Sequence, residues 1–217
     1  MVLFMNYRRN NKRLSVAGRG EYLSTSDFIV KYYTNLVACR KFFFDMKWPT
    51  GYYCEKCGCT HYYFMKSKNC YRCAHCKHDE RLFTNTIFQD NKLPLNVLLY
   101  GLFLIFTSKK GISSLELSEE LKVNYKTACL LQTKARILMK NSNSKKSLDS
   151  SFYESDVAYT GAPSHNGKRG LGTDKQPFLV VLSTEQENKY PLYIKLHEVS
   201  SDSGNIIQAF FDQYVKM

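Results

Sequence analysis

Residues 54–76, CEKCGCTHYYFMKSKNCYRCAHC, decide how the first third of this 217-residue chain folds. The stretch holds two C-x2-C pairs separated by fifteen residues, formed by Cys54, Cys57, Cys73 and Cys76. Two tight turns with this spacing can place four thiolates around one tetrahedral zinc ion. The sequence therefore predicts a zinc ribbon, in which short antiparallel strands are held together by a structural metal ion.

Other side chains in and near this stretch leave alternatives open. Cys70 forms a competing C-x2-C pair with Cys73, and a histidine could replace one thiolate, the candidates being His61, His75 and His78. Because two complete pairs already supply four ligands, we expect these histidines at the surface. We expect the remaining thiols to be free, those of Cys39, Cys59 and Cys129. Eight cysteines could instead form disulfides in a secreted protein, but no export signal is recognisable, so metal is favoured.

The charge of the chain is distributed unevenly. Residues 1–147 carry 25 Lys and Arg against 10 Asp and Glu, a net of +15, whereas residues 148–217 carry 6 against 9, a net of −3. A basic front half predicts a polyanionic partner, and with a zinc ribbon it favours nucleic acid. The most apolar stretch, residues 93–107, is interrupted by Pro94, Asn96 and Gly101 and is too short for a membrane span. We expect no membrane association.

The first 92 residues divide into two parts. Residues 1–25 are polar and basic and predict a flexible arm, and residues 26–92 predict a helix followed by the ribbon. Apolar residues recur at helical spacing over residues 26–47, namely Phe28, Tyr32, Leu36, Cys39 and Phe43. Pro49 disfavours helical geometry at Trp48 and ends this helix. Strands are expected around residues 62–65 and 81–83.

Residues 93–140 predict a helical region with a helix-turn-helix pattern. Ser113 precedes a helix with Glu116 three residues later, which is a capping box. Apolar positions fit two helices joined by a tight turn: Ile112, Leu117, Leu121, Val123 and Ala128. We expect an outward face that contacts DNA phosphates and base edges, carrying Lys122, Asn124, Tyr125, Lys126, Gln132 and Arg136. Two packed helices with a solvated basic face are the simpler alternative.

The last third of the chain has a different pattern. Residues 141–151 are polar and serine-rich and predict a linker. Residues 152–217 predict three strands, over 152–160, 178–183 and 190–199, and an amphipathic helix over 205–216. A glycine-rich loop between the first two strands carries Lys168 and Arg169, which could contact a DNA phosphate or keep the loop soluble.

Several strings occur in a fixed order along the chain: Trp48-Pro49-x-Gly51-Tyr52-x-Cys54-x-x-Cys57-Gly58, Tyr71-x-Cys73-x-x-Cys76, LFTNTIFQD at 82–90, Leu93-Pro94-Leu95, SKKGIS at 108–113, Tyr125-Lys126-Thr127-Ala128, Glu154-x-Asp156-x-x-Tyr159-x-Gly161 and KRGLGTDK at 168–175. Their order and spacing resemble those of bacterial insertion-sequence transposases with an N-terminal zinc ribbon and a DDE-type, ribonuclease H-like catalytic domain. The resemblance covers residues 25–217. It favours Cys73 with Cys76 over Cys70, and it places Asn85 where the family usually has glycine.

This resemblance implies a multidomain α+β protein. Its parts are an N-terminal helix with a zinc ribbon, a helix-turn-helix-like DNA-binding region, and the first three strands and first helix of a ribonuclease H-like fold. In the DNA-binding region, Lys109 and Lys110 are further candidates for contact with DNA. The resemblance implies that the partner is double-stranded DNA at the ends of the element, bound in the bacterial cytoplasm. The chain could also form homo-oligomers.

The resemblance assigns Asp156 the role of the first catalytic carboxylate. Phosphoryl transfer of this type uses two divalent ions, Mg²⁺ in the intact family, held about 4 Å apart by converging carboxylates. The remaining acids stand in expected loops or on a helix surface, namely Glu185, Glu187, Glu198, Asp202 and Asp212. We therefore expect a C-terminally truncated transposase that binds DNA, does not hold Mg²⁺ productively and does not cut DNA alone.

Two other functions fit parts of the sequence. One is a zinc-dependent transcriptional regulator without enzymatic activity, which would bind promoter operators rather than element ends. The other is an RNA-binding zinc ribbon, since 16 Tyr and 14 Phe are available to stack on bases. Much of that aromatic content lies at helical core positions, which weakens the RNA hypothesis.

Overall fold

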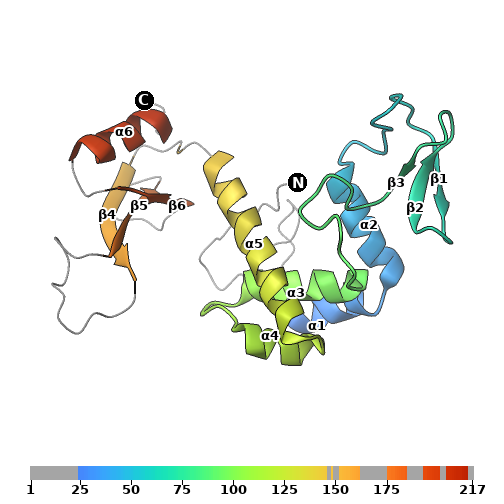
Figure 1. Ribbon diagram of the computed structural model, residues 1–217, viewed down its shortest axis with the longest axis horizontal. Helices are drawn as coiled ribbons and strands as arrows, with labels where there is room; N and C mark the ends of the chain where they lie inside the picture. Colours follow the sequence, from blue (N-terminus) through green and yellow to red (C-terminus); the bar gives the residue numbers. More distant parts are fainter. Residues whose placement is uncertain are drawn as a thin grey trace. The chain divides into compact units, whose positions relative to one another are not determined.

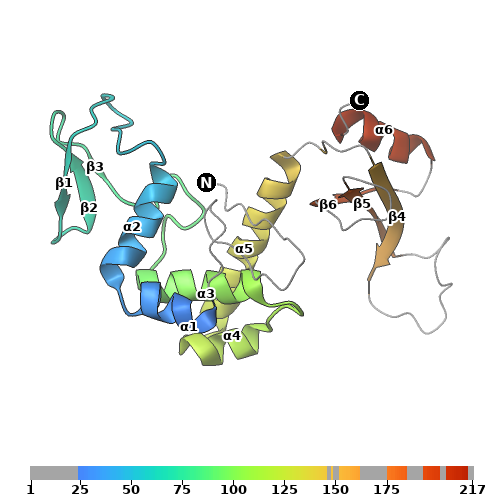
Figure 2. The same ribbon diagram turned by 180° about the vertical axis from the view of Figure 1, so that it is seen from behind.

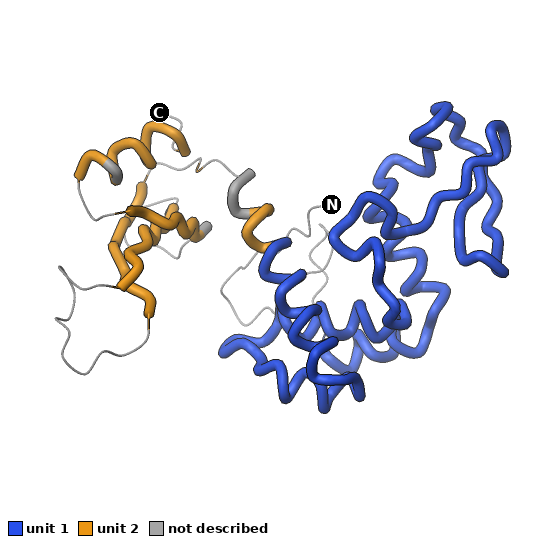
Figure 3. Tube along the Cα trace, in the orientation of Figure 1, with its two compact units in different colours: residues 1–6, 13–138 blue, residues 7–12, 139–217 orange. Residues whose placement is uncertain are grey.

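The computed structural model describes residues 24–145, 148, 152–161, 175–184, 193–200 and 204–214. The described chain divides into two compact units, one ending at Leu138 and the other beginning at Met139 (Figure 3). Each unit has its own hydrophobic core. Within the described ranges, no helix combines the length and hydrophobicity that a membrane crossing requires.

The predicted N-terminal helix is three elements rather than one. They are α1 (Thr25–Phe28), the π-helical segment η1 (Ile29–Tyr33) and α2 (Leu36–Lys47). The side chain of Asn35 accepts a hydrogen bond from the Ala38 N–H at 3.1 Å and begins α2 anew. The break changes the phase of the apolar stripe. Leu36, expected in the core, is therefore 53% exposed, whereas Phe28 and Phe43 are buried as predicted.

The ribbon is a three-stranded antiparallel sheet of order β1-β2-β3 (Figure 1). Its strands are β1 (Tyr62–Met65), β2 (Cys70–Cys73) and β3 (Asp79–Glu80). The third strand comes just before the predicted run at 81–83, where the chain already turns. Asn85 adopts a left-handed φ of 60°. Glycine and asparagine are the residues that tolerate this conformation, which accounts for Asn85 at a position where the resembled family has glycine.

Two helices and most of a third complete the first unit: α3 (Leu95–Thr107), α4 (Ser114–Leu121) and α5 (Tyr125–Lys145), whose last residues, from Met139 on, belong to the second unit. Ser113 caps α4 as predicted, because its hydroxyl accepts from the Glu116 N–H at 3.1 Å. A three-residue turn joins α4 to α5, with Lys122 in the left-handed region at φ 55°. Figures 1 and 2 show α3 and α4 near the start of α5, and Phe28 of α1 stacks on Phe103 of α3 with ring centroids 4.1 Å apart.

A close helix crossing explains the glycine inside α3. A Cβ at Gly101 would lie 2.6 Å from Leu131 Cδ2 and 2.8 Å from Leu121 Cδ1. Both leucines are buried, so neither side chain has free space into which it can retreat. Glycine at this point is what allows α3 to approach α4 and α5 so closely.

The second unit is an antiparallel sheet of order β4-β5-β6 with one helix. Its elements are β4 (Phe152–Thr160), β5 (Gln176–Thr184), β6 (Tyr193–Glu198) and α6 (Gly204–Tyr214). These elements match the predicted strands and helix closely. Helix α5 continues to Lys145, into the range 141–151 where the sequence predicts a linker, and the Leu148 N–H donates to the Tyr214 carbonyl at 2.8 Å.

Helix α6 packs on one face of this sheet (Figure 1). Leu179, Val181 and Phe210 form the centre of the small core between them. Lys195 is also buried on this face, with Nζ 3.7 Å from the centroid of the Tyr214 ring. Burial lowers the pKa of Lys195, as expected for an ammonium group moved away from water.

Replacing Gly101 with alanine should destabilise the first unit, because the added methyl group overpacks the crossing. The expected loss in the free energy of unfolding is about 1–3 kcal/mol, measured by urea denaturation. Gly204→Ala is the control, since a Cβ there meets no atom within 4 Å. Equal stability of Gly101→Ala and the wild type would show that the crossing is not tightly packed.

Candidate metal centre and nucleic-acid interface

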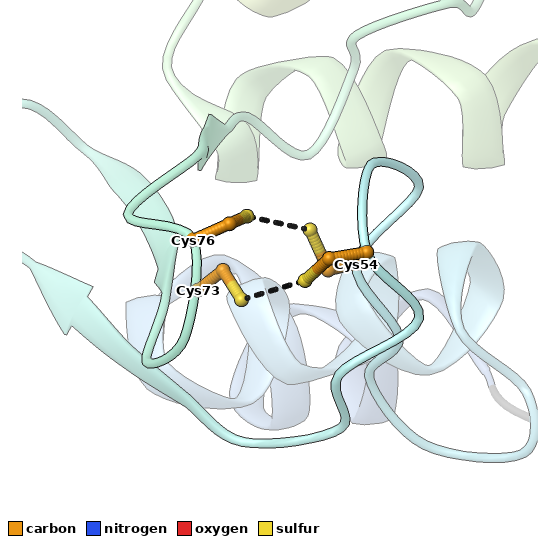
Figure 4. Close-up of side chains that lie close together, drawn as sticks. Cys54, Cys73 and Cys76 are labelled. Atoms are coloured by element: carbon orange, nitrogen blue, oxygen red, sulfur yellow. Dashed lines mark hydrogen bonds between the residues drawn. The ribbon is translucent and has the colours of Figure 1, made fainter.

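The four cysteines of the two C-x2-C pairs converge on one point. Their Sγ atoms all lie within 4.8 Å of one another. Cys54 Sγ lies 3.6 Å from Cys76 Sγ, and Cys57 Sγ lies 3.5 Å from Cys73 Sγ. Figure 4 shows these thiols facing each other across the gap between two turns. Zinc–sulfur bonds of about 2.3 Å in a tetrahedron would separate the sulfurs by about 3.8 Å, so the cluster fits a structural zinc ion.

Two turns with the same backbone geometry supply the ligands. In the first, the Cys54 N–H donates to the Cys59 carbonyl at 2.9 Å, and in the second the Cys73 N–H donates to the His78 carbonyl at 2.9 Å. The residue after the second cysteine of each turn is left-handed, with φ 71° at Gly58 and 61° at Lys77. Each turn therefore presents its two thiols in the same way, which is how two local motifs build one four-ligand cage.

The thiols affect one another electrostatically. Burial raises the pKa of Cys73, but N–H groups of Cys76 and His75 and neighbouring thiols lower it to about 6. At Cys57 the Cys59 N–H lowers the pKa, while burial and the three other thiols raise it to about 12. One thiolate thus forms readily and its neighbour retains a proton. Only a cation among the four sulfurs would stabilise all four as thiolates.

The competing ligands lie outside the cluster. Cys70 is buried on β2 in register with Met65 and is not among the converging sulfurs. All eight cysteines are free of disulfides, as expected for a metal site. His61 and His75 are exposed, and in the described part of the chain the four cysteines are the one group able to hold a metal. The choice of Cys73 with Cys76 over Cys70 agrees with this geometry.

A cluster of aromatic rings connects the metal centre to α2. Trp48 lies 5.0 Å from Tyr52 and 5.3 Å from Tyr71 between ring centroids, and Phe44 lies 4.8 Å from Trp48. Burial, followed by the nearby Cys54, Cys73 and Glu80, raises the pKa of Tyr52. Its hydroxyl therefore stays protonated beside the thiols. The ribbon has little core of its own, so these rings supply much of the apolar contact that orients it.

An ion pair lies under the same cluster. Lys47 Nζ, on the last turn of α2, is 2.6 Å from Glu80 Oε1 on β3, and the two side chains are 9% and 0% exposed. The ammonium group also donates to the Arg81 carbonyl at 2.7 Å. Nothing in the sequence pattern pointed to this pair, because the two residues are 33 positions apart and only the fold brings them together.

The outer face of the ribbon carries a second ion pair. Arg72 and Asp79 are cross-strand neighbours and form a two-pronged contact in which Arg72 Nη2 lies 2.6 Å from Asp79 Oδ2. Hydrogen bonds from Arg72 hold the pKa of Asp79 below its usual value. The sequence did not predict this pair either. Alternation along β2 could have suggested it, since Arg72 is the polar residue between Tyr71 and Cys73.

The predicted DNA-contacting residues of the helical region are mostly at the surface. The exposed ones are Lys109, Lys110, Lys122, Asn124, Tyr125, Lys126 and Arg136. Asn124 Oδ1 accepts from the Lys126 N–H at 2.9 Å and so caps the start of α5. Gln132 was expected on the outward face, and this expectation was wrong. Its amide is buried, donates to the Ile112 carbonyl at 2.6 Å and fixes the loop before α4.

Asp156 lies exposed on β4, in register with Val180 of β5. Its Oδ1 accepts a hydrogen bond from the Val157 N–H at 2.8 Å. Among the described residues, no group of three metal-binding side chains includes Asp156. Two further site residues named from the sequence, Lys168 and Arg169, lie outside the described residues.

Residues 37–79 match the family model described as the transposase zinc-ribbon domain (IS1595). No curated protein and no solved structure matches the chain. The match begins at the second residue of α2 and ends at the first residue of β3. It thus covers the whole metal centre together with its supporting helix, and it supports a transposase-related protein with a role in DNA binding.

Removal of one ligand should abolish zinc binding. The purified protein should contain about one zinc ion per chain, measured by elemental analysis, and Cys73→Ser should lose it and unfold the ribbon. Cys59→Ser is the matched control, because this partly exposed thiol is two residues from Cys57 but outside the cluster. Loss of zinc from Cys59→Ser, or a zinc-free wild type, would contradict the assignment.

The buried ion pair gives a second prediction. Glu80→Gln leaves the Lys47 charge buried without its carboxylate, so the unfolding free energy should fall by about 3–5 kcal/mol. The exposed pair Lys41–Asp45 is the control, and Asp45→Asn should cost less than about 1 kcal/mol. Urea denaturation of the zinc-loaded protein measures both. If Glu80→Gln lowers the unfolding free energy by as little as Asp45→Asn does, the Lys47–Glu80 pair does not stabilise the ribbon.

Proposed function

We propose that this protein is the DNA-binding transposase of an insertion sequence, acting on double-stranded DNA at the ends of its element in the bacterial cytoplasm. The observation that carries the proposal is the four-sulfur cluster inside the segment that matches a transposase zinc-ribbon domain. The strongly basic charge of residues 1–147 supports a polyanionic partner. A zinc ribbon alone occurs in many proteins, so the match and the charge are needed together.

In this proposal the helical region, residues 93–140, is the main DNA-binding part. Helices α4 and α5 act as a helix-turn-helix, with α5 entering the major groove. Lys109, Lys110 and Lys122 bind phosphates on one side of the groove. Arg136 and the loop residues Lys168 and Arg169 bind further phosphates, while Asn124, Tyr125 and Lys126 lie at the groove itself.

We assign the second unit a catalytic ancestry without independent activity. Asp156 takes the position of the first carboxylate of a two-metal site. One exposed carboxylate with no described metal-binding partners cannot hold two Mg²⁺ ions. In this proposal the protein binds element ends, and catalysis requires further carboxylates beside Asp156.

Binding to the terminal inverted repeats that flank the gene tests this function. Fluorescence anisotropy should give tighter binding to a repeat duplex than to a duplex from the promoter region, and affinity should fall steeply with salt. The double variant Lys122→Ala/Lys126→Ala should reduce the slope of log affinity against log salt by about two. Lys41→Ala, on the exposed surface of α2, should leave the slope unchanged.

The choice between the two duplexes distinguishes the candidate functions. Preference for the promoter duplex would favour a transcriptional regulator over a transposase. Asp156→Ala should bind the repeat duplex as tightly as the wild type. Salt-independent affinity, or no affinity for duplex DNA at low salt, would overturn the proposed function.

A further inference from the structure

One side of α5 exposes large apolar side chains to solvent. Ala128, Leu131 and Ala135 face the core and are almost fully buried, whereas Leu130 and Ile137 are 55% and 41% exposed. The two exposed residues are seven positions apart and so lie on the same side of the helix, opposite the core. A helix at a protein surface usually has polar residues there, so this stripe indicates a surface that contacts a partner.

The charge of the same helix identifies the kind of partner. Residues 125–145 contain no Asp or Glu, and they contain five basic residues: Lys126, Lys134, Arg136, Lys140 and Lys145. Lys126 and Arg136, on either side of Leu130 along the helix, are both exposed. An apolar stripe flanked only by cations is complementary to a polyanion that also presents apolar groups. Duplex DNA is such a partner, because thymine methyl groups lie between its phosphates in the major groove.

The position of Leu130 along α5 is suitable for contact with bases. The helix begins at Tyr125, directly after the turn that ends at Asn124, and Leu130 is on its second turn, about 8 Å along the axis from the start. In helix-turn-helix proteins the first turns of the second helix reach the base edges. Ile137 is about 10 Å further along and lies beyond that part of the helix.

The neighbour of Leu130 on this side is Thr133. Its hydroxyl donates to the Cys129 carbonyl at 2.9 Å, so this donor is already used within the helix. The side chain of Leu130 has no hydrogen-bonding group, and the Thr133 hydroxyl, which donates within the helix, does not donate to a base. Beside Lys126 and Lys134, this part of α5 therefore offers methyl groups to whatever it contacts.

We infer that Leu130 is a specificity-determining residue that contacts the 5-methyl group of a thymine in the major groove. The inference rests on the proposed function and adds to it the base that this side of the helix selects. Thymine is the base that carries a methyl group on the major-groove edge. Cytosine presents an amino group there, and an apolar side chain against it would leave a donor without a partner.

Deoxyuridine tests this contact directly, because it differs from thymidine in lacking the 5-methyl group. The probe is a duplex enriched by the wild-type protein from a library of randomised duplexes, with each thymine replaced in turn by deoxyuridine. At one position the replacement should weaken wild-type binding by about fourfold, the effect of losing one buried methyl-sized group. Leu130→Ala should lose a similar factor on the original duplex and should no longer respond to the replacement.

Leu115→Ala is the matched control. Leu115 is the same residue type with similar exposure, 60%, but it lies on α4. This variant should bind like the wild type and should keep the deoxyuridine effect. Both leucines are at the surface, so both variants should fold, which zinc content and the urea transition of the first unit verify.

Three outcomes would overturn the inference, and they differ from one another. If Leu130→Ala keeps the full deoxyuridine effect, another residue reads the methyl group. If Leu130→Ala binds DNA normally but changes the oligomeric state, the stripe is a protein interface. If the wild type enriches no duplex at all, the proposed function fails, and this inference fails with it.

Discussion

Mutual repulsion among four cysteine thiolates is the constraint on which the first unit depends. Thiols held within 4.8 Å of one another cannot all ionise unless a cation lies between them. The strands of the ribbon are only four, four and two residues long. A sheet this small has too little core to be stable alone, so zinc binding should stabilise the folded ribbon directly.

The ribbon is also part of a larger core. Trp48 and the rings around it continue the apolar contacts of α2 towards the cysteines, and the Lys47–Glu80 pair joins the end of α2 to β3. Through α2 and η1 the same core reaches α3, where Gly101 permits a close approach of the next two helices. The basic helices are therefore held by the same core that surrounds the metal centre.

The sequence predicted the features that depend on local spacing. The C-x2-C pairs, the Ser113 cap and the apolar positions of α4 and α5 follow from short-range rules, and they were found where expected. The predicted burial of Leu36 was wrong because a break in the helix before it changes which side of the helix faces the core. The predicted exposure of Gln132 was wrong because its side chain binds the carbonyl of Ile112, which is distant in sequence. The Lys47–Glu80 pair could not be predicted, since sequence separation contains no information about which charges the fold brings together. The catalytic role of Asp156 rests on resemblance, because its exposed position on β4 does not distinguish a metal ligand from a solvated side chain.

The four ligands of the metal centre differ in access to solvent. Cys54 and Cys73 are buried, Cys76 is half-buried and Cys57 is exposed. A chelator or an oxidant arriving from solution thus meets the cage first at Cys57. In a zinc-loaded ribbon, exchange of the ion would therefore begin with release of the Cys57 ligand.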